Sequence, residues 1–290
     1  MKPDRFGIFA AALACATVAC AEPSRPPAEL GLDPFYVRYV DAGGVPVVAS
    51  NRTPPEALEV ARDIVLGLTA HRPDLHRNIV ANGVRVAVIA PDEGTVDLPE
   101  QRHWRKPTPD DPRLTRCERK HYQERIGRLS DRDYWNARAR GMAGRLTSGA
   151  TEDLLGLPSS RYYGENIFLH EFAHVVLWAI RDVDPALNAR IERAYTDAKA
   201  SGRWRDEYAL TTVDEYWAEG TQFWFNSNKV ATFDGQVVLS DADLARYDPA
   251  LAAVLREAYG DRHRIPADRF HRHAARVPPG PLPKFTAEVC

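Results

Sequence analysis

The sequence is poor in cysteine and methionine and has no strong excess of charge of either sign. Of its 290 residues, four are cysteine and two are methionine, and the formal net charge is −2. With so little net charge, we expect no general affinity for nucleic acid or for an anionic membrane surface. No two cysteines show the Cys-x-x-Cys spacing, which argues against a cysteine-ligated zinc site.

The sequence also lacks a convincing membrane-spanning run at its N-terminus. The uncharged run at residues 6–21 is short and rich in alanine, follows Lys2 and Arg5, and precedes the helix-breaking EPSRPP. A basic head, a short apolar core and small residues at the end are typical of a secretory signal peptide. We therefore expect residues 1–21 to be a signal peptide, no transmembrane segment, and export to the periplasm or the extracellular space.

Two cleavage sites stay open. ACA, residues 19–21, has the small-x-small form that a general signal peptidase cuts. TVAC, residues 17–20, resembles an imperfect lipoprotein box, which would leave a lipid anchor on Cys20. Simple export is favoured, because Thr17 stands where a lipoprotein box usually has leucine.

Export changes what the remaining cysteines indicate. Either cleavage leaves Cys117 and Cys290 as thiol candidates. In an oxidising compartment two leftover cysteines are most simply a disulfide, which would pin the C-terminus to the middle of the chain. Two free thiols are the alternative.

The hydrophobic pattern predicts an α+β fold. Residues 45–50 and 84–91 read as strands, and between them a helix starts near Thr53, where Thr53 and Glu56 have capping-box spacing. Strand, helix, strand indicates a mixed sheet with a helix on it. Further helix patterns occupy the second half of the chain, at residues 164–180, 211–225 and 240–260.

Residues 101–145 form an arginine-rich insertion, with 13 Lys/Arg against 6 Asp/Glu. A polyanion site is one interpretation. A solvated insertion is favoured, because aspartates are interleaved with the basic residues. We expect four aromatic residues to anchor this segment on the core: Trp104, Tyr122, Tyr134 and Trp135.

HEFAH, residues 170–174, indicates a metal site within the helix pattern of residues 164–180. On a helix His170 and His174 lie one turn apart on one face, so both can bind a single zinc ion. Glu171 can reach a water at the metal without ligating it, as a hydrolase requires. The flanking residues are apolar, and two buried histidines with a glutamate are costly without a partner. The alternative is a core pair of histidines satisfied by hydrogen bonds.

A third ligand is expected from DEYWAEG, residues 214–220. Glu215 and Glu219 are four apart and share one helix face, so one can bind the metal while the other accepts the outer N–H of a metal histidine. The structural alternative is a helix start, because Thr212 and Glu215 have the spacing of a capping box.

HExxH followed by a glutamate-bearing helix resembles the gluzincin metallopeptidases. YALTTVDEYWAE, residues 208–219, is similar to the YAxT…E(F/Y)(F/W)AE pattern of the C-terminal protease domain of anthrax lethal factor and its relatives. The resemblance extends over about residues 84–230. It implies that Glu215 is the third zinc ligand, that Glu219 is an outer partner, and that Tyr208 points into the active site.

The resemblance implies a zincin-like fold, with a twisted mixed sheet, an active-site helix and a mostly helical C-terminal part. We expect a linker at residues 22–44 and one metallopeptidase-like domain at 45–290. Within it, residues 45–163 would form the α/β part with the insertion, and residues 164–290 the helical part with the zinc site. An edge strand that holds an extended substrate is expected within residues 146–153.

The expected activity is that of a zinc metallopeptidase, monomeric, acting on a peptide or protein substrate. Zn²⁺ held by His170, His174 and Glu215 would lower the pKa of a water toward about 7. Glu171 would act as general base and Tyr208 would stabilise the oxyanion. Three alternatives stay open: an inert zinc-binding scaffold, a toxin or effector with one narrow target, and a zinc hydrolase of a non-peptide bond.

Overall fold

The computed structural model describes residues 24–233, 235–282 and 290. The expected signal peptide, residues 1–21, and the candidate lipid anchor Cys20 lie outside the described residues. None of the helices in the described part combines the length and the apolar character that crossing a membrane requires.

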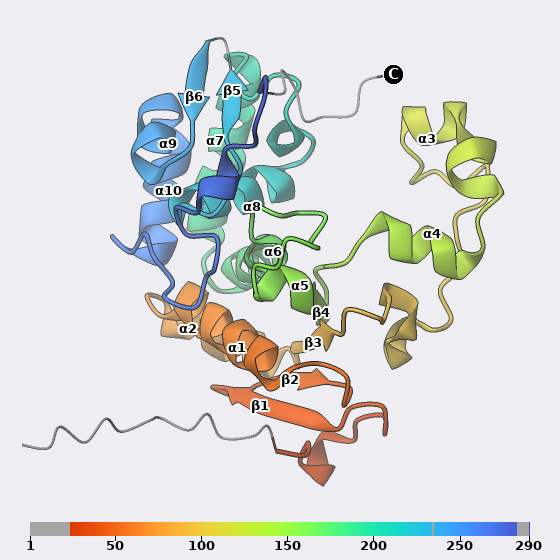
Figure 1. Ribbon diagram of the computed structural model, residues 1–290. Helices are drawn as coiled ribbons and strands as arrows, with labels where there is room; N and C mark the ends of the chain where they lie inside the picture. The colour runs from red at the N-terminus through yellow and green to blue at the C-terminus, as the bar shows by residue number, and fades with distance from the viewer. Residues whose placement is uncertain (1–23, 234, 283–289) are drawn as a thin grey trace, which may run out of the picture.

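A four-stranded mixed sheet forms one end of the molecule (Figure 1). Its strands, in spatial order, are β1 (Arg38–Ala42), β2 (Val45–Ala49), β3 (Arg85–Ile89) and β4 (Leu146–Ala150). β1 is antiparallel to β2, whereas β2, β3 and β4 are parallel. The strands expected at 45–50 and 84–91 are confirmed as β2 and β3. The expected linker, residues 22–44, instead contains β1, which pairs with β2 along its whole length.

Helices make up most of the rest of the described chain. Those of the N-terminal half are α1 (Pro55–Thr69), α2 (Pro73–Ala81), α3 (Arg116–Lys120), α4 (Asp131–Arg138) and α5 (Thr151–Leu154). Those of the C-terminal half are α6 (Ile167–Val183), α7 (Pro185–Ala200), α8 (Val213–Trp224), α9 (Asp241–Tyr247) and α10 (Pro249–Tyr259). A small hairpin joins β5 (Ala231–Phe233) to β6 (Gln236–Val238). The α+β class and the mostly helical C-terminal part are therefore confirmed.

Single helical turns lie between these elements. Those of 3₁₀ type are Ala28–Leu30, Thr95–Asp97, Pro99–Gln101, Tyr208–Leu210 and Ala274–Arg276, and a π-type turn spans Gln123–Gly127.

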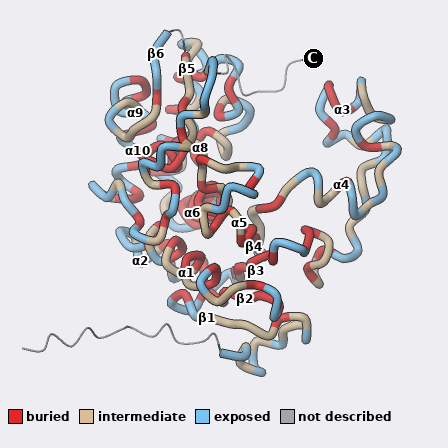
Figure 2. The backbone as a smooth tube through the Cα atoms, in the orientation of Figure 1, coloured by how far each residue is buried: buried red, intermediate tan, exposed pale blue. Residues whose placement is uncertain are grey.

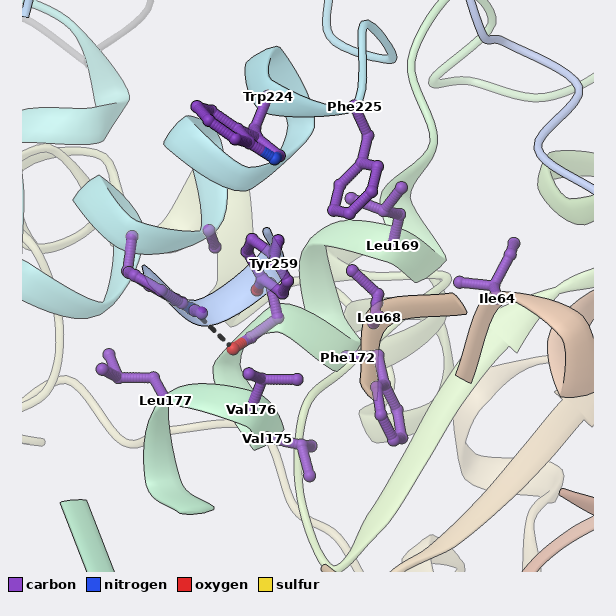
Figure 3. Close-up of a cluster of buried hydrophobic side chains, with 14 of the residues drawn as sticks. Ile64, Leu68, Leu169, Phe172, Val175, Val176, Leu177, Trp224, Phe225 and Tyr259 are labelled. Atoms are coloured by element: carbon purple, nitrogen blue, oxygen red, sulfur yellow. Dashed lines mark hydrogen bonds between the residues drawn. The ribbon is translucent and has the colours of Figure 1, made fainter. Parts of the chain in front are cut away.

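The main core lies between the sheet and the C-terminal helices. α1 covers the sheet, and its Ile64 and Leu68 belong to the same buried cluster as Phe172 and Val176 of α6 (Figure 3). The opposite face of α6 is left to carry His170 and His174. Burial is concentrated in this body, whereas α3 and α4 extend away from it with much exposed surface (Figure 2).

The start of α1 differs from the expected capping box. Pro54 is the N-cap, and no side chain caps the helix. Thr53 is fully buried and donates its hydroxyl to the carbonyl of Val88 in β3, at 3.2 Å. The hydroxyl therefore joins α1 to the sheet, because a buried hydroxyl must find a partner and this carbonyl lies next to it.

Residues 101–140, which we call the arm, have a small core of their own. Leu114, Ile126 and Tyr134 are buried together, apart from the main cluster. The four aromatic residues expected to anchor the segment on the core pack here instead: Tyr122 and Trp135 flank this cluster, and the rings of Trp104 and Trp135 lie 4.7 Å apart. A disulfide joins Cys117 of α3 to Cys290, which confirms the expected pairing.

Candidate metal centre

The start of α6 is fixed by two side chains that accept its first N–H groups. The Asn166 side chain accepts from the backbone of Leu169 at 2.9 Å, and Asp153 accepts from Ile167 at 3.0 Å and from Phe168 at 3.3 Å. The free N–H groups of a helix start need such acceptors when they are buried. The helix therefore begins at a defined residue, and His170 lies in its first turns.

α8 is held against α6 by contacts at its first half. Thr212 is its N-cap and accepts from the backbone of Glu215 at 3.1 Å, and the indole of Trp217 donates to the carbonyl of Ala173 at 3.0 Å. Arg181 forms a bidentate ion pair with Asp214, with N···O distances of 2.9 and 2.8 Å. These bonds set both the position and the rotation of α8, which directs Glu215 toward the histidines.

His170, His174 and Glu215, which we call the ligand triad, form a group that could hold a metal ion. Nε2 of His170 lies 3.2 Å from Nε2 of His174 and 3.0 Å from Oε2 of Glu215. The third separation, from His174 Nε2 to Glu215 Oε2, is 3.5 Å.

These separations can be tested against the geometry of zinc. Zinc binds nitrogen and carboxylate oxygen at about 2.0–2.1 Å, so neighbouring corners of its tetrahedron lie about 3.3–3.4 Å apart. The three observed separations scatter around that value. A single proton between these atoms can bridge only two of them, whereas one cation accepts lone pairs from both histidine nitrogens and the carboxylate oxygen at once. The donor set and its spacing therefore fit zinc.

The outer nitrogen of His170 faces two candidate acceptors on α8. Oε1 of Gln222 lies 2.9 Å from Nδ1, and Oε1 of Glu219 lies 3.4 Å from it. Oε2 of Glu219 accepts a shorter bond, at 2.7 Å, from the side chain of Asn228. Gln222 was not predicted from the sequence, although it lies seven residues after Glu215, on the same face of α8.

Tyr208 and Glu171 lie beside the ligand triad. The Tyr208 hydroxyl donates to Oε1 of Glu215 at 3.0 Å, and its ring centre is 6.4 Å from that of His170. Glu171 is half-buried, and the backbone N–H of Ala143 faces its carboxylate. The five residues predicted to act at the metal are therefore all brought together, and Glu219 lies behind them.

Electrostatics in the centre follow from burial and from the close contact of opposite charges. Burial alone would lower the pKa of His170, but the hydrogen bond that Glu215 accepts from it and the charges of Glu219 and Glu171 outweigh burial and raise the pKa to about 10. For the acidic Glu215, burial alone would raise the pKa, but its hydrogen bonds to both histidines bring the pKa well below its usual range. A site that retains a proton so strongly is one that attracts a cation.

The pKa values of Glu171, Glu219 and Tyr208 are raised, whereas that of Glu215 is lowered. Burial raises the pKa of Glu171, against the pull of both histidines. Burial also raises the pKa of Glu219, to about 7. Burial and the Glu215 carboxylate raise the pKa of Tyr208, so this phenol keeps its proton and remains a hydrogen-bond donor.

The triad opens into a cleft of about 630 Å³. Apolar side chains line part of it: Met142, Trp204, Phe223 and Phe233. Residues 141–143, which we call the edge segment, line another part. Met142 exchanges two backbone hydrogen bonds with Ser148 of β4, at 3.2 and 2.9 Å, so the edge segment runs antiparallel to β4.

The expectation of a substrate-binding edge strand at residues 146–153 is wrong, because the edge segment lies between β4 and the cleft. Only residues 146–150 are a strand, and residues 151–154 form α5. β4 pairs with β3 on one side and meets Met142 on the other, so its backbone is not the free edge at this point. GMA has no strand-like pattern in the sequence, which is why sequence reasoning missed it.

Neither a scan of protein-family models nor a search of curated proteins gave a match. A search of solved structures found the PRO-PRO endopeptidase (PPEP-2) from Paenibacillus alvei. The match has a TM-score of 0.45 and 14% sequence identity, and it covers 73% of this chain and 96% of that chain. Similarity at this level supports no statement about activity, and the resemblance to lethal-factor-type gluzincins rests on the two motifs.

Proposed function

We propose that the protein is an exported zinc-dependent metallopeptidase. One observation carries the proposal: three ligand atoms at the spacing of a zinc tetrahedron lie in a cleft, with Glu171 beside them. His170, His174 and Glu215 would hold the ion. When bound, zinc would supply the Lewis acidity that lowers the pKa of a water to about 7 and polarises a carbonyl.

Glu171 is the proposed general base and acid. It lies next to His170 in the sequence, lines the cleft, and has the N–H of Ala143 facing its carboxylate. Burial brings its pKa upward from the ordinary range of a carboxylate, toward the pH at which a base and an acid are equally useful. It would take a proton from the attacking water and deliver it to the leaving amine.

Tyr208 is the proposed oxyanion donor. Its hydroxyl donates to Oε1 of Glu215, the carboxylate oxygen next to the one in the ligand triad, and its raised pKa keeps the proton on the phenol. A small rotation would let the same O–H donate to the oxygen of a tetrahedral intermediate, where charge develops during peptide hydrolysis.

The edge segment is the proposed docking site for an extended peptide. Because Met142 directs its N–H and C=O groups at Ser148, residues 141 and 143 present theirs to the opposite side, where the N–H of Ala143 faces Glu171 and the other groups line the cleft. A peptide could pair there as an added strand, with its side chains reaching alternate walls of the cleft. Trp204, Phe223 and Phe233 favour apolar side chains on one of those walls.

Export stays part of the proposal, with the lipid anchor on Cys20 as a variant of it. The Cys117–Cys290 disulfide is compatible with an oxidising compartment. Two alternatives for the activity remain: a catalytically inert zincin-like binding or scaffold protein, and a zinc hydrolase acting on a non-peptide bond.

The test uses the purified mature protein with a panel of unstructured peptides and a parallel panel of esters. We expect about one zinc per chain and cleavage of peptides. Glu171→Gln should retain the zinc and lower kcat/KM by roughly 10²–10⁴-fold, because it removes proton transfer and leaves the ligands in place. A Glu171→Gln protein with parental turnover would contradict the assignment.

Glu192→Gln is the matched control. Glu192 lies exposed on α7, bonded to Asn188 at 2.9 Å. It should leave both zinc and turnover unchanged. A parent that binds zinc but cleaves only esters would favour the non-peptide hydrolase, and one that cleaves neither panel would favour the scaffold.

A further inference from the structure

The side chain of Gln222 is fully buried and binds α6 at two points. Its Nε2 donates to the carbonyl of Asn166 at 3.1 Å, and its Oε1 lies 2.9 Å from Nδ1 of His170. Asn166 is the N-cap residue of α6, so the same residue that starts the helix also holds the Gln222 amide.

These two contacts determine which atom of the amide faces the histidine. A backbone carbonyl can only accept a hydrogen bond, so the NH₂ group of Gln222 must face Asn166. The amide oxygen must then face His170, and Nδ1 of His170 must be the donor. When the ring is neutral, as metal binding requires, the lone pair is then on Nε2 and is directed at His174 and Glu215.

Glu219 is less suited to this task. Its nearer oxygen lies 3.4 Å from Nδ1 of His170, against 2.9 Å for Gln222. Its other oxygen is engaged by Asn228 at 2.7 Å. The main hydrogen bond of the Glu219 carboxylate therefore joins α8 to Asn228, in the chain that follows the helix.

We propose that Gln222, rather than Glu219, is the positioning residue that fixes the His170 ring with its proton on Nδ1 and thereby sets the zinc affinity of the site. This inference rests on the proposed function, because it requires that the ligand triad binds zinc. The amide oxygen accepts the Nδ1 proton and so fixes the tautomer, the task that a carboxylate or a backbone carbonyl performs at other metal-binding histidines.

The experiment measures the zinc dissociation constant by competition with a chromophoric chelator, on the full mature chain. Gln222→Met keeps the approximate size of the side chain and removes both polar atoms. It should weaken zinc binding by about 10- to 100-fold, the usual effect of losing an outer hydrogen-bond partner. Glu219→Gln should change the constant by less than about threefold.

A second readout separates positioning from general damage. In the zinc-loaded parent labelled with ¹⁵N-histidine, the Nδ1–H proton of His170 should give a slowly exchanging NMR signal. Gln222→Met should lose that signal or exchange it much faster, while the melting temperature of its metal-free form stays near that of the parent.

If Gln222→Met fails to fold, Gln222→Glu decides, because it keeps an acceptor at the same place. Zinc binding within about threefold of the parent supports the inference, and a loss of tenfold or more overturns it. Gln222→Met with the parental constant, or Glu219→Gln with the larger loss, also overturns it. A parent that binds no zinc overturns the proposed function itself, and this inference with it.

Discussion

Helices α6 and α8 and the arm of residues 101–140 both border the cleft, yet different forces hold them in place. α6 and α8 are packed over most of their length into the main core, where Phe172, Tyr216 and Trp217 are fully buried. Their partners include α1 and α2, which are distant in the sequence, as well as α7 and α10. Displacing a ligand helix would therefore mean opening the core.

The arm is held by contacts that lie close to it in the sequence. Its core has three buried residues, and the ammonium of Lys106 donates to the carbonyls of Ile126 and Gly127 at 3.2 and 2.6 Å. Several of its arginines form ion pairs with carboxylates, among them Arg138 with Glu118 at 3.0 Å. The Cys117–Cys290 bond is its long-range covalent tie.

This difference indicates where the molecule can change without disturbing the ligand triad. The positions of the ligand atoms depend on the packing of the core, so substitutions in the core around α6 and α8 should disturb them. The arm borders the same cleft through Arg138 and Ala139 but depends on its own contacts. We expect changes in the arm to alter substrate handling while the zinc site remains intact.

The largest expected effect on stability comes from the disulfide. A Cys117→Ser, Cys290→Ser double variant removes a bond between residues 173 apart, which is worth roughly 4–5 kcal/mol in the chain-entropy model. That stabilisation acts on the unfolded chain, so denaturant unfolding should show a large loss while the zinc dissociation constant changes less than about threefold. A large loss of zinc affinity would show that the arm and the metal centre are not independent.

A pair of core truncations sharpens the comparison. Phe172→Ala on α6 should lower the free energy of unfolding of the main body by about 3–5 kcal/mol, because it opens a cavity in the core. Ile126→Ala in the arm should leave that main transition nearly unchanged and instead increase protease cleavage within residues 101–140. Equal losses in the main transition would contradict the separation of the two cores.

The pH dependence of stability should differ between the metal-free and the zinc-loaded protein. The raised pKa of His170, about 10 against an ordinary value of 6.5, means that the folded metal-free protein binds a proton that the unfolded chain releases. Its contribution is complete below pH 6.5 and is lost as the pH rises toward 10. Melting temperatures of an EDTA-treated sample should fall across that range, and those of a zinc-loaded sample should fall less. Parallel curves would argue against zinc taking the place of this proton.

The smallest expected effects come from two matched Arg–Asp pairs. Arg113 and Asp111 form an exposed two-bonded pair in the arm, whereas Arg181 and Asp214 hold the start of α8. Arg113→Ala should cost less than about 1 kcal/mol and leave zinc binding unchanged. Arg181→Ala should cost a similar amount but weaken zinc binding several-fold, since Asp214 is next to Glu215. Chelator competition would distinguish them, and equal zinc constants would contradict the role given to Arg181.

Much of the metal centre was predictable because it lies on helices. The i, i+4 rule places His170 and His174 on one face, and the i, i+7 position on the same face, counted from Glu215, is Gln222. The helices at 164–180 and 211–225 were predicted within a few residues of α6 and α8. Apolar periodicity is strong there because both helices pack against the core.

Other features leave little trace in the sequence. α7 is half polar and offers a weak apolar stripe, and β1 is a short strand with only one buried residue. The edge segment depends on a single backbone contact with Ser148, which side-chain patterns do not encode. The arm is held largely by ion pairs and has little apolar periodicity. Its arginine-rich composition could therefore be read from the sequence, but its fold could not.

The most direct test of the central claim is the zinc content of the purified mature protein beside its Glu215→Gln variant, by elemental analysis after metal reconstitution. One zinc per chain in the parent, sharply reduced in the variant, is the predicted result. A parent without zinc would contradict the account and leave HEFAH as a structural helix, and zinc in both proteins would require a different third ligand.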